Sequence, residues 1–215
     1  MPWMEQLRSA NWSQASCIAL AAYLLGCFTP GYYLVRLRLG QDLRDLGSGS
    51  VGARNVGRLL GWQGFLLTVL GDLGKGALAV WATRHFTADD RLVLVAMVAV
   101  VVGHVWPVQL LFRGGKGMAT SLGALLVFDF ELVLVFALLF ATAFAALRKT
   151  VLPGLFALTC LPLMSWYLTH SLPELVGTSV LAGVVLLAHR GNLANELSQF
   201  LDRRNIHPQQ HPPEL

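Results

Sequence analysis

The sequence is poor in charged residues. Only 13% of its 215 residues are Asp, Glu, Lys or Arg, whereas a soluble domain usually carries about 25%. Hydrophobic residues make up 55%. They form successive apolar runs, most of them close to the length of about 20 residues that a membrane span needs. This composition predicts an all-α fold, a polytopic membrane helix bundle in which residues 1–204 form a single domain.

The sequence lacks the residue patterns of metal sites, nucleic-acid-binding surfaces and secretory signals. The three cysteines, Cys17, Cys27 and Cys160, stand in apolar segments without metal-ligand spacing, which predicts small packing residues and no bound metal. No nucleic-acid partner is expected, because apolar segments separate the basic residues. Residues 1–15 lack the basic region of a secretory signal. The segment 205–215, rich in proline and glutamine, is expected to be a disordered tail.

About seven transmembrane helices are predicted. The candidate segments are 16–38, 62–83, 91–111, 117–128, 131–147, 151–168 and 172–190. Backbone polar groups must pair internally in lipid, so each segment should be a helix. The fourth is short for a span of roughly 20 residues, and we expect it to be tilted or half-embedded.

The basic residues predict the orientation. With the N-terminus outside, twelve Lys and Arg residues fall on inner segments and three on outer ones. Cytoplasmic segments carry such an excess, so the C-terminus should be cytoplasmic and the number of spans odd. The polar segments 40–61, 112–117 and 189–204 would then share the cytoplasmic face.

The first polar segment contains the run LGSGSVGARNVGRLLG. Its glycines would let backbone N–H groups converge on an anion, and Ser48, Ser50, Arg54 and Arg58 would complete a phosphate site. The match to G-x-G-x-x-G follows a membrane helix and not a strand, so a dinucleotide fold is rejected. A flexible loop with orientation-setting arginines is an equally good interpretation of this segment taken alone.

The second polar segment reads FRGGKG. Gly114, Gly115 and Gly117 surround Lys116, which is more glycine than a turn needs and favours an anion site. It is not a Walker A loop, because Leu110 stands where that motif requires glycine. A tight turn with topology-setting charges is the alternative.

Two histidines accompany these segments. His104 precedes FRGGKG, although a lone histidine near an interface is more often structural. His189 and Asn192 are spaced i, i+3 and share one face if the helix continues. His189 could hold a proton near neutral pH, and Asn192 could orient a substrate. A polar helix end at the interface is the competing interpretation.

One span contains charges of both signs. Asp72 and Lys75 are spaced i, i+3 and can pair, as charges inside a membrane usually must. We expect a structural ion pair for Asp72, whereas Lys75 could instead reach toward the cytoplasmic site.

Together these segments resemble the acyl-phosphate:glycerol-3-phosphate acyltransferases, the PlsY family. The family motif G-S-G-N-x-G-A-T-N-x-x-R, followed later by D-x-x-K-G, reads GSGSVGARNVGR and DLGKG here. The motif G-H-x-F-P-x-x-x-x-F-K-G-G-K-G-x-A-T reads GHVWPVQLLFRGGKGMAT, and H-R-x-N-I reads HRGNL. The resemblance extends from about residue 16 to residue 200.

The resemblance implies transfer of a fatty acyl group from acyl phosphate to the 1-hydroxyl of glycerol 3-phosphate. The products are lysophosphatidate and phosphate, at the first step of membrane phospholipid synthesis. It implies no cofactor, a long-chain acyl phosphate as donor, a site at the cytoplasmic face of the cell (inner) membrane, and a soluble acyl-phosphate-producing enzyme as candidate partner. Acyl phosphate is an activated anhydride, which agrees with the absence of a plausible cysteine or serine triad.

The resemblance also assigns roles to residues. The implied catalytic residues are Ser48, His189 and Asn192. The implied phosphate-binding residues are Arg58, Asn55, Gly114, Gly115, Lys116, Gly117, Lys75 and His104.

The sequence departs from the family motifs at several positions. The departures are Ser50 for Asn, Arg54 for Thr, Arg113 for Lys, and, at the end of the third motif, Asn195, Gln199 and Leu201. A divergent paralogue with altered or lost activity is therefore one alternative. A membrane anion (phosphate) transporter is another, ranked lower because both glycine segments lie at one surface and no internal repeat is visible.

Overall fold

A computed structural model of the chain describes residues 12–205, and over that range the regular structure is helical, without strands. The prediction of an all-α fold is confirmed. The α-helices run in the order α2 (Trp12–Cys27), α3 (Pro30–Leu39), α4 (Ala53–Phe86), α5 (Asp90–Val105), α6 (Met118–Phe128), α7 (Phe130–Leu147), α8 (Val151–Thr169), α9 (Leu172–Ala188) and α10 (Arg190–Asn205). Two short 3-10 helices, η1 (Leu43–Asp45) and η2 (Val108–Leu110), lie in the connections. Of the predicted disordered tail, 205–215, the first residue ends α10. Residues 206–215 lie outside the described residues.

The chain is a multi-pass membrane protein. Within the described residues, five helical segments are long and apolar enough to cross a bilayer: Trp12–Leu39, Ala53–Phe86, Asp90–Leu110, Phe130–Leu147 and Val151–Thr169. A sixth candidate joins α9 to the start of α10 through a bend of 61°. Helix α6 has 11 residues, or about 17 Å against a hydrocarbon core of about 30 Å. All seven predicted segments are therefore helical, while their crossing count and the orientation of the termini stay predictions.

The first two predicted spans differ in detail from the helices that form. The first breaks after Cys27, and Pro30 then begins α3, where a residue without a backbone N–H loses no helical hydrogen bond. The second begins earlier than expected, at Ala53, because the sequence ARNVGRLL contains good helix formers and folds as helix and not as loop. Gly61 interrupts α4 with φ 70°, a left-handed conformation that suits glycine.

Glycines let two pairs of helices approach closely. A β-carbon added at Gly76 or Gly123 would lie within 2.1 Å of a backbone carbonyl oxygen across the α4–α6 contact. The same holds for Gly26 and Gly103 across the α2–α5 contact. Small residues serve this purpose in membrane helix packing, where close van der Waals contact replaces the hydrophobic effect.

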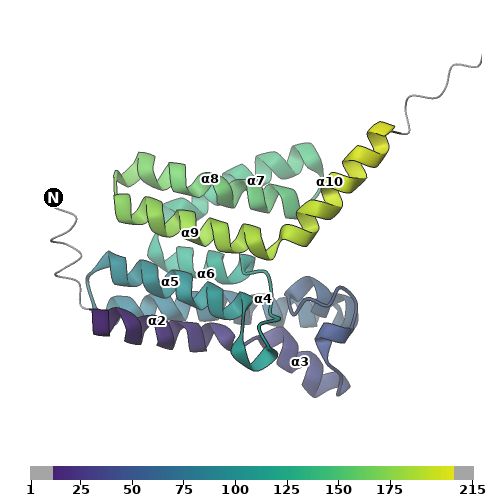
Figure 1. Cartoon of the computed structure of the whole chain (residues 1–215), viewed down its shortest axis with the longest axis horizontal. Coiled ribbons are helices and arrows are strands. Elements are labelled where there is room, and N and C mark those ends of the chain that lie inside the picture. The colour runs from purple at the N-terminus through teal and green to yellow at the C-terminus, as the bar shows by residue number, and fades with distance from the viewer. Residues whose placement is uncertain (1–11, 206–215) are drawn as a thin grey trace, which may run out of the picture.

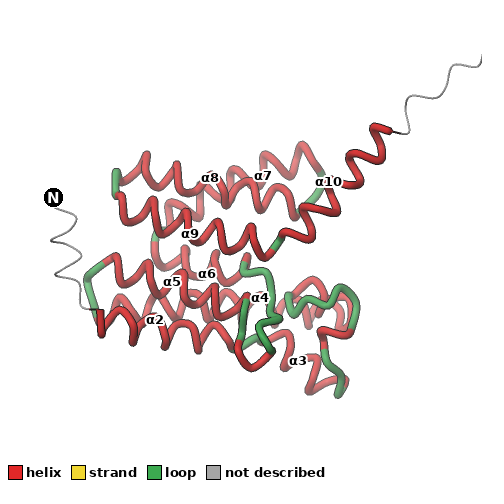
Figure 2. Tube along the Cα trace, viewed as in Figure 1, coloured by secondary structure: helices red, strands yellow, loops and turns green. Residues whose placement is uncertain are grey.

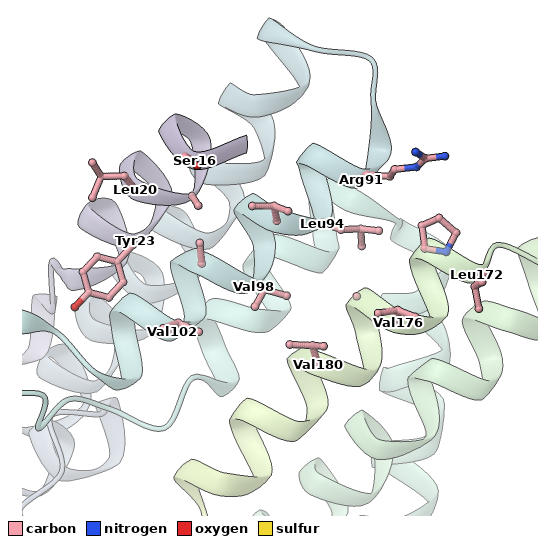
Figure 3. Close-up of a pocket in the computed structure, with 15 residues that line it drawn as sticks. Ser16, Leu20, Tyr23, Arg91, Leu94, Val98, Val102, Leu172, Val176 and Val180 are labelled. Carbon is pink, nitrogen blue, oxygen red and sulfur yellow. The ribbon is translucent and has the colours of Figure 1, made fainter. Parts of the chain in front are cut away.

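Helices α2, α5 and α9 enclose an apolar groove of about 1220 Å³. Figure 3 shows aliphatic side chains such as Leu20, Val98 and Val180 along it, with Tyr23 and Arg91 also at its walls. Among the described residues that line this groove, Arg91 alone is charged. The groove thus lacks the cations and glycines that the sequence singled out.

The polar segments gather at one end of the bundle. Figures 1 and 2 show α3, the connection from α3 to α4, the connection from α5 to α6 and the start of α10 at the same end of the helices. The three segments that the sequence grouped on one face are therefore neighbours in space.

Candidate active site

A cavity of about 620 Å³ joins these segments. Its polar wall comes from the start of α4 and the preceding loop, from the FRGGKG loop and from the α9–α10 bend, and includes Ser48, Ser50, Arg54, Asn55, Arg58, His104, Lys116, His189 and Asn192. Its apolar wall comes from α4, α6 and α7 and includes Phe65, Val69, Met118, Leu122, Phe136 and Phe140. One cavity therefore offers surfaces for a charged group and for a hydrocarbon chain.

The arginines and the lysine of the wall have no carboxylate partners within residues 12–205. Arg54, Arg58 and Lys116 form no ion pair with any described residue. The two acidic residues of the wall are already paired, Asp72 with a buried lysine and Glu196 with a lysine in the α7–α8 connection. The cavity is therefore electropositive and suited to an anion such as phosphate.

Asn55 organises the loop that carries Ser48. It is 2% exposed, and its Oδ1 accepts a hydrogen bond from the Ser48 N–H at 3.0 Å. Its Nδ2 donates to Leu46 O at 2.9 Å and to Ser50 O at 3.0 Å. Both amide hydrogens are thus engaged. The structure places Asn55 at the cavity wall but gives it a positioning role for the loop, where the sequence predicted direct contact with phosphate.

The first two glycines of FRGGKG pack against α5. The Gly114 N–H donates to Val105 O at 3.1 Å and the Gly115 N–H to His104 O at 3.0 Å. A β-carbon would lie 2.2 Å from His104 O at Gly114 and 2.1 Å from His104 Nε2 at Gly115. These N–H groups are not available to an anion, and neither glycine lines the cavity. The predicted anion nest is replaced here by a tightly packed loop.

Lys116 and Gly117 do line the cavity. Gly117 has φ 83° and caps α6, which redirects the chain after Lys116. The Lys116 ammonium donates to Asn192 Oδ1 on α10. Burial lowers the pKa of Lys116, and the nearby Arg54 guanidinium lowers it further. An ammonium with a depressed pKa and no carboxylate partner is stabilised by a bound phosphate.

His189 lies at the bend between α9 and α10. It is 6% exposed, and its Nδ1 lies 2.9 Å from Val185 O. A carbonyl oxygen can only accept, so Nδ1 carries the proton and Nε2 of the neutral ring is an acceptor. The helix does not continue through this point as the i, i+3 argument assumed, yet His189 and Asn192 both reach the cavity.

Lys75 belongs to a buried cluster. Its Nζ lies 2.9 Å from Asp72 Oδ1 and 2.7 Å from His104 Nδ1, and His104 Nδ1 lies 3.2 Å from the same carboxylate oxygen. Lys75 also donates to Gly26 O at 3.1 Å and Phe28 O at 2.7 Å, where α2 ends. The predicted ion pair is confirmed. The resemblance implied that Lys75 binds phosphate, but Lys75 does not line the cavity. Its ammonium instead donates hydrogen bonds to carbonyl groups that have no helical partner because α2 ends there.

Sequence reasoning missed part of the cavity. Glu196 lines it and pairs with Lys149, although Glu196 is out of register with the family's glutamate. The apolar wall from α7, with Phe136 and Phe140, was also missed, because a uniformly apolar helix gives no sign of which side faces a cavity. The side chains of Gln199 and Leu201 lie outside the described residues. Among the described residues, no three His, Cys, Asp or Glu side chains converge on a metal site.

Gly115→Ala should destabilise the protein by about 1–3 kcal/mol, because its methyl group collides with the His104 ring. Thermal unfolding in detergent would measure the loss. The matched control is Gly74→Ala in α4, where no atom lies within 4 Å of the added carbon and little change is expected. If Gly115 instead bound an anion through its N–H, Gly115→Ala would alter substrate KM and leave stability unchanged.

Comparison with known proteins agrees with this geometry. The sequence model of the family described as glycerol-3-phosphate acyltransferase matches residues 16–199. A glycerol-3-phosphate acyltransferase 1 of Desulfitobacterium hafniense (strain Y51) is 44% identical, over 86% of this chain and 92% of the relative. The corresponding protein of Gloeobacter violaceus is 38% identical over 85% of this chain and 91% of its own length.

Solved structures agree as well. The crystal structure of PlsY, an integral membrane glycerol 3-phosphate acyltransferase, in its glycerol 3-phosphate form has a TM-score of 0.79 at 32% identity, covering 86% of this chain and 92% of that one. The lysophosphatidic acid form gives 0.76 at 30% identity with the same coverage. The fold, the cavity and these similarities together show that the chain belongs to the glycerol-3-phosphate acyltransferase family.

Proposed function

We propose that the protein transfers a fatty acyl group from acyl phosphate to the 1-hydroxyl of glycerol 3-phosphate, giving lysophosphatidate and phosphate. The observation that carries this proposal is the single cavity with unpaired cations on one wall and aromatic and aliphatic side chains on another. Both substrates carry phosphate, and one carries a long hydrocarbon chain. The names of the relatives and the two ligand forms of PlsY support the acceptor and the product class.

In this proposal the phosphate of glycerol 3-phosphate lies between Lys116 and Arg58. Charge-assisted hydrogen bonds from both side chains would fix it, and Ser48 would donate a further hydrogen bond through its hydroxyl. Asn192 holds the Lys116 ammonium in place. The acyl chain would extend along the wall that contains Phe65, Phe136 and Phe140, and so remain in contact with the membrane-embedded helices.

The chemistry needs positioning and charge neutralisation more than a covalent nucleophile. The 1-hydroxyl oxygen attacks the acyl carbonyl carbon, and the bond between that carbon and the phosphate oxygen breaks. Phosphate leaves with the bonding electron pair, and the hydroxyl proton ends on the phosphate. His189 Nε2, an unprotonated acceptor at the cavity wall, would orient the hydroxyl through a hydrogen bond. Catalytic roles for Ser48, His189 and Asn192 are part of this proposal.

We place the cavity at the cytoplasmic face of the cell (inner) membrane. The arginines and lysines around it supply the positive charge that cytoplasmic segments usually carry. A soluble enzyme that makes acyl phosphate would then have direct access to the site and is the proposed partner.

Purified protein in lipid should turn over palmitoyl phosphate and glycerol 3-phosphate, with release of phosphate and formation of lysophosphatidate. Acyl-CoA and acyl carrier protein donors would be assayed in parallel, and turnover with one of these alone would contradict the proposed donor. Phosphate flux across proteoliposomes without any acyl donor would instead support the transporter alternative.

A further inference from the structure

Arg54 is a third cation without an ion pair among the described residues, in a cavity that already contains Arg58 and Lys116. It lies in the first turn of α4, directly after Ala53, the first residue of that helix. A positive side chain at the start of a helix is repelled by the helix dipole, so this position is unfavourable for it unless an anion is bound nearby. Arg54 is therefore a cavity-lining cation whose charge no described carboxylate neutralises.

The reaction brings two phosphate groups into this one cavity. A phosphate monoester carries a charge of about −1.5 to −2 near neutral pH, and the donor's phosphate remains negative as it leaves. The repulsion between two such groups is offset only when a cation lies beside each of them. Lys116 and Arg58 account for the phosphate of glycerol 3-phosphate in the proposed function, which leaves the second phosphate without a charged partner.

We propose that Arg54 binds the phosphate of the acyl donor and holds it as inorganic phosphate after transfer. This inference rests on the proposed function, because it requires a phosphate-activated donor. The planar guanidinium can donate two parallel hydrogen bonds to one phosphate, which a lysine cannot do. Arg54 and Lys116 line the same cavity, so both phosphates would be held within it, with the acceptor hydroxyl near the donor carbonyl.

The test compares Arg54→Gln and Arg54→Lys with the wild-type enzyme in lipid. Arg54→Gln should raise the KM for palmitoyl phosphate by about 10-fold or more, which corresponds to one lost charge-assisted phosphate contact. Arg54→Lys keeps the charge but loses the second parallel hydrogen bond, so its KM for palmitoyl phosphate should lie between those of the wild type and Arg54→Gln. The KM for glycerol 3-phosphate should change little in either variant. The matched control is Arg113→Gln, an exposed arginine outside the cavity, which should alter neither constant.

Product inhibition provides a second measurement. Inorganic phosphate should compete with palmitoyl phosphate in the wild-type enzyme, and its inhibition constant should rise in Arg54→Gln by a factor similar to the KM. Arg54 is exposed at the cavity and opposes the helix dipole, so Arg54→Gln should unfold at the wild-type temperature or slightly above it.

Three results would overturn the inference while leaving the proposed function intact. They are a rise in the KM for glycerol 3-phosphate alone, unchanged kinetics in Arg54→Gln, and absence of phosphate competition in the wild type. If the wild-type enzyme fails to use palmitoyl phosphate but uses another donor, the proposed function itself fails, and the inference fails with it.

Discussion

Lys116→Ala is expected to lower kcat/KM for glycerol 3-phosphate by about 100-fold or more, because a phosphate in a partly buried site loses a charge-assisted partner. The expected loss falls mainly on the KM for glycerol 3-phosphate if Lys116 binds ground state and transition state equally, and on kcat if its contact strengthens as charge develops. Steady-state kinetics with both substrates varied would distinguish these cases. The Lys116→Ala variant without substrate should stay folded. Lys116 forms no ion pair with a described residue, so its removal leaves no carboxylate unpaired.

The matched control is Arg113→Ala. Arg113 has the same sign of charge, stands in the same FRGGKG loop and is exposed, yet it does not line the cavity. Its substitution should leave kcat/KM within about twofold, because a solvent-exposed charge contributes little. Equal losses in the two variants would mean that the loop acts through its general positive charge. Normal kinetics in Lys116→Ala would contradict the phosphate assignment.

The sequence was sufficient for the architecture and for the main members of the site. Apolar runs identified α2, α4, α5, α6, α7, α8 and α9 as helices. Glycine, arginine and lysine in otherwise apolar surroundings identified the segments that meet at the cavity, including Ser48, Arg58 and Lys116. These features depend on composition and local pattern. They can be recognised without knowing what each segment packs against.

For some residues the structure shows tertiary contacts that compete with the role predicted from the sequence. Gly114 and Gly115 have the composition of an anion nest, but their N–H groups are donated to the last turn of α5. Asn55 has the right side chain for a ligand contact, but the loop around Ser48 folds onto it. In each case a backbone group elsewhere in the chain takes the hydrogen bond, and no local pattern shows that competition.

Lys75 illustrates the same limit and supports the last prediction. The motif D-x-x-K-G suggests a substrate lysine, whereas the side chain is 4% exposed and surrounded by Asp72, His104 and the carbonyls of Gly26 and Phe28. Its ammonium, on α4, donates hydrogen bonds to carbonyl groups at the end of α2. The cluster therefore fixes the first span against the helix that begins at the cavity.

Lys75→Met should accordingly destabilise the protein by about 3–5 kcal/mol, because it leaves the Asp72 carboxylate buried without its main cation. Methionine keeps most of the side-chain volume, so a cavity contributes little to the loss. Thermal unfolding in detergent gives the measurement, and the stability effect should appear whether or not substrates are present.

The double variant Lys75→Met/Asp72→Asn distinguishes a buried ion pair from simple packing. Removing the stranded charge should restore a large part of the lost stability, so the double variant should be more stable than Lys75→Met alone. Additive losses would mean that Lys75 acts chiefly through the carbonyls at the end of α2. A Lys75→Met protein with wild-type stability but a raised KM for glycerol 3-phosphate would restore Lys75 to the substrate site. That result would require the ammonium to leave its four polar neighbours when phosphate binds.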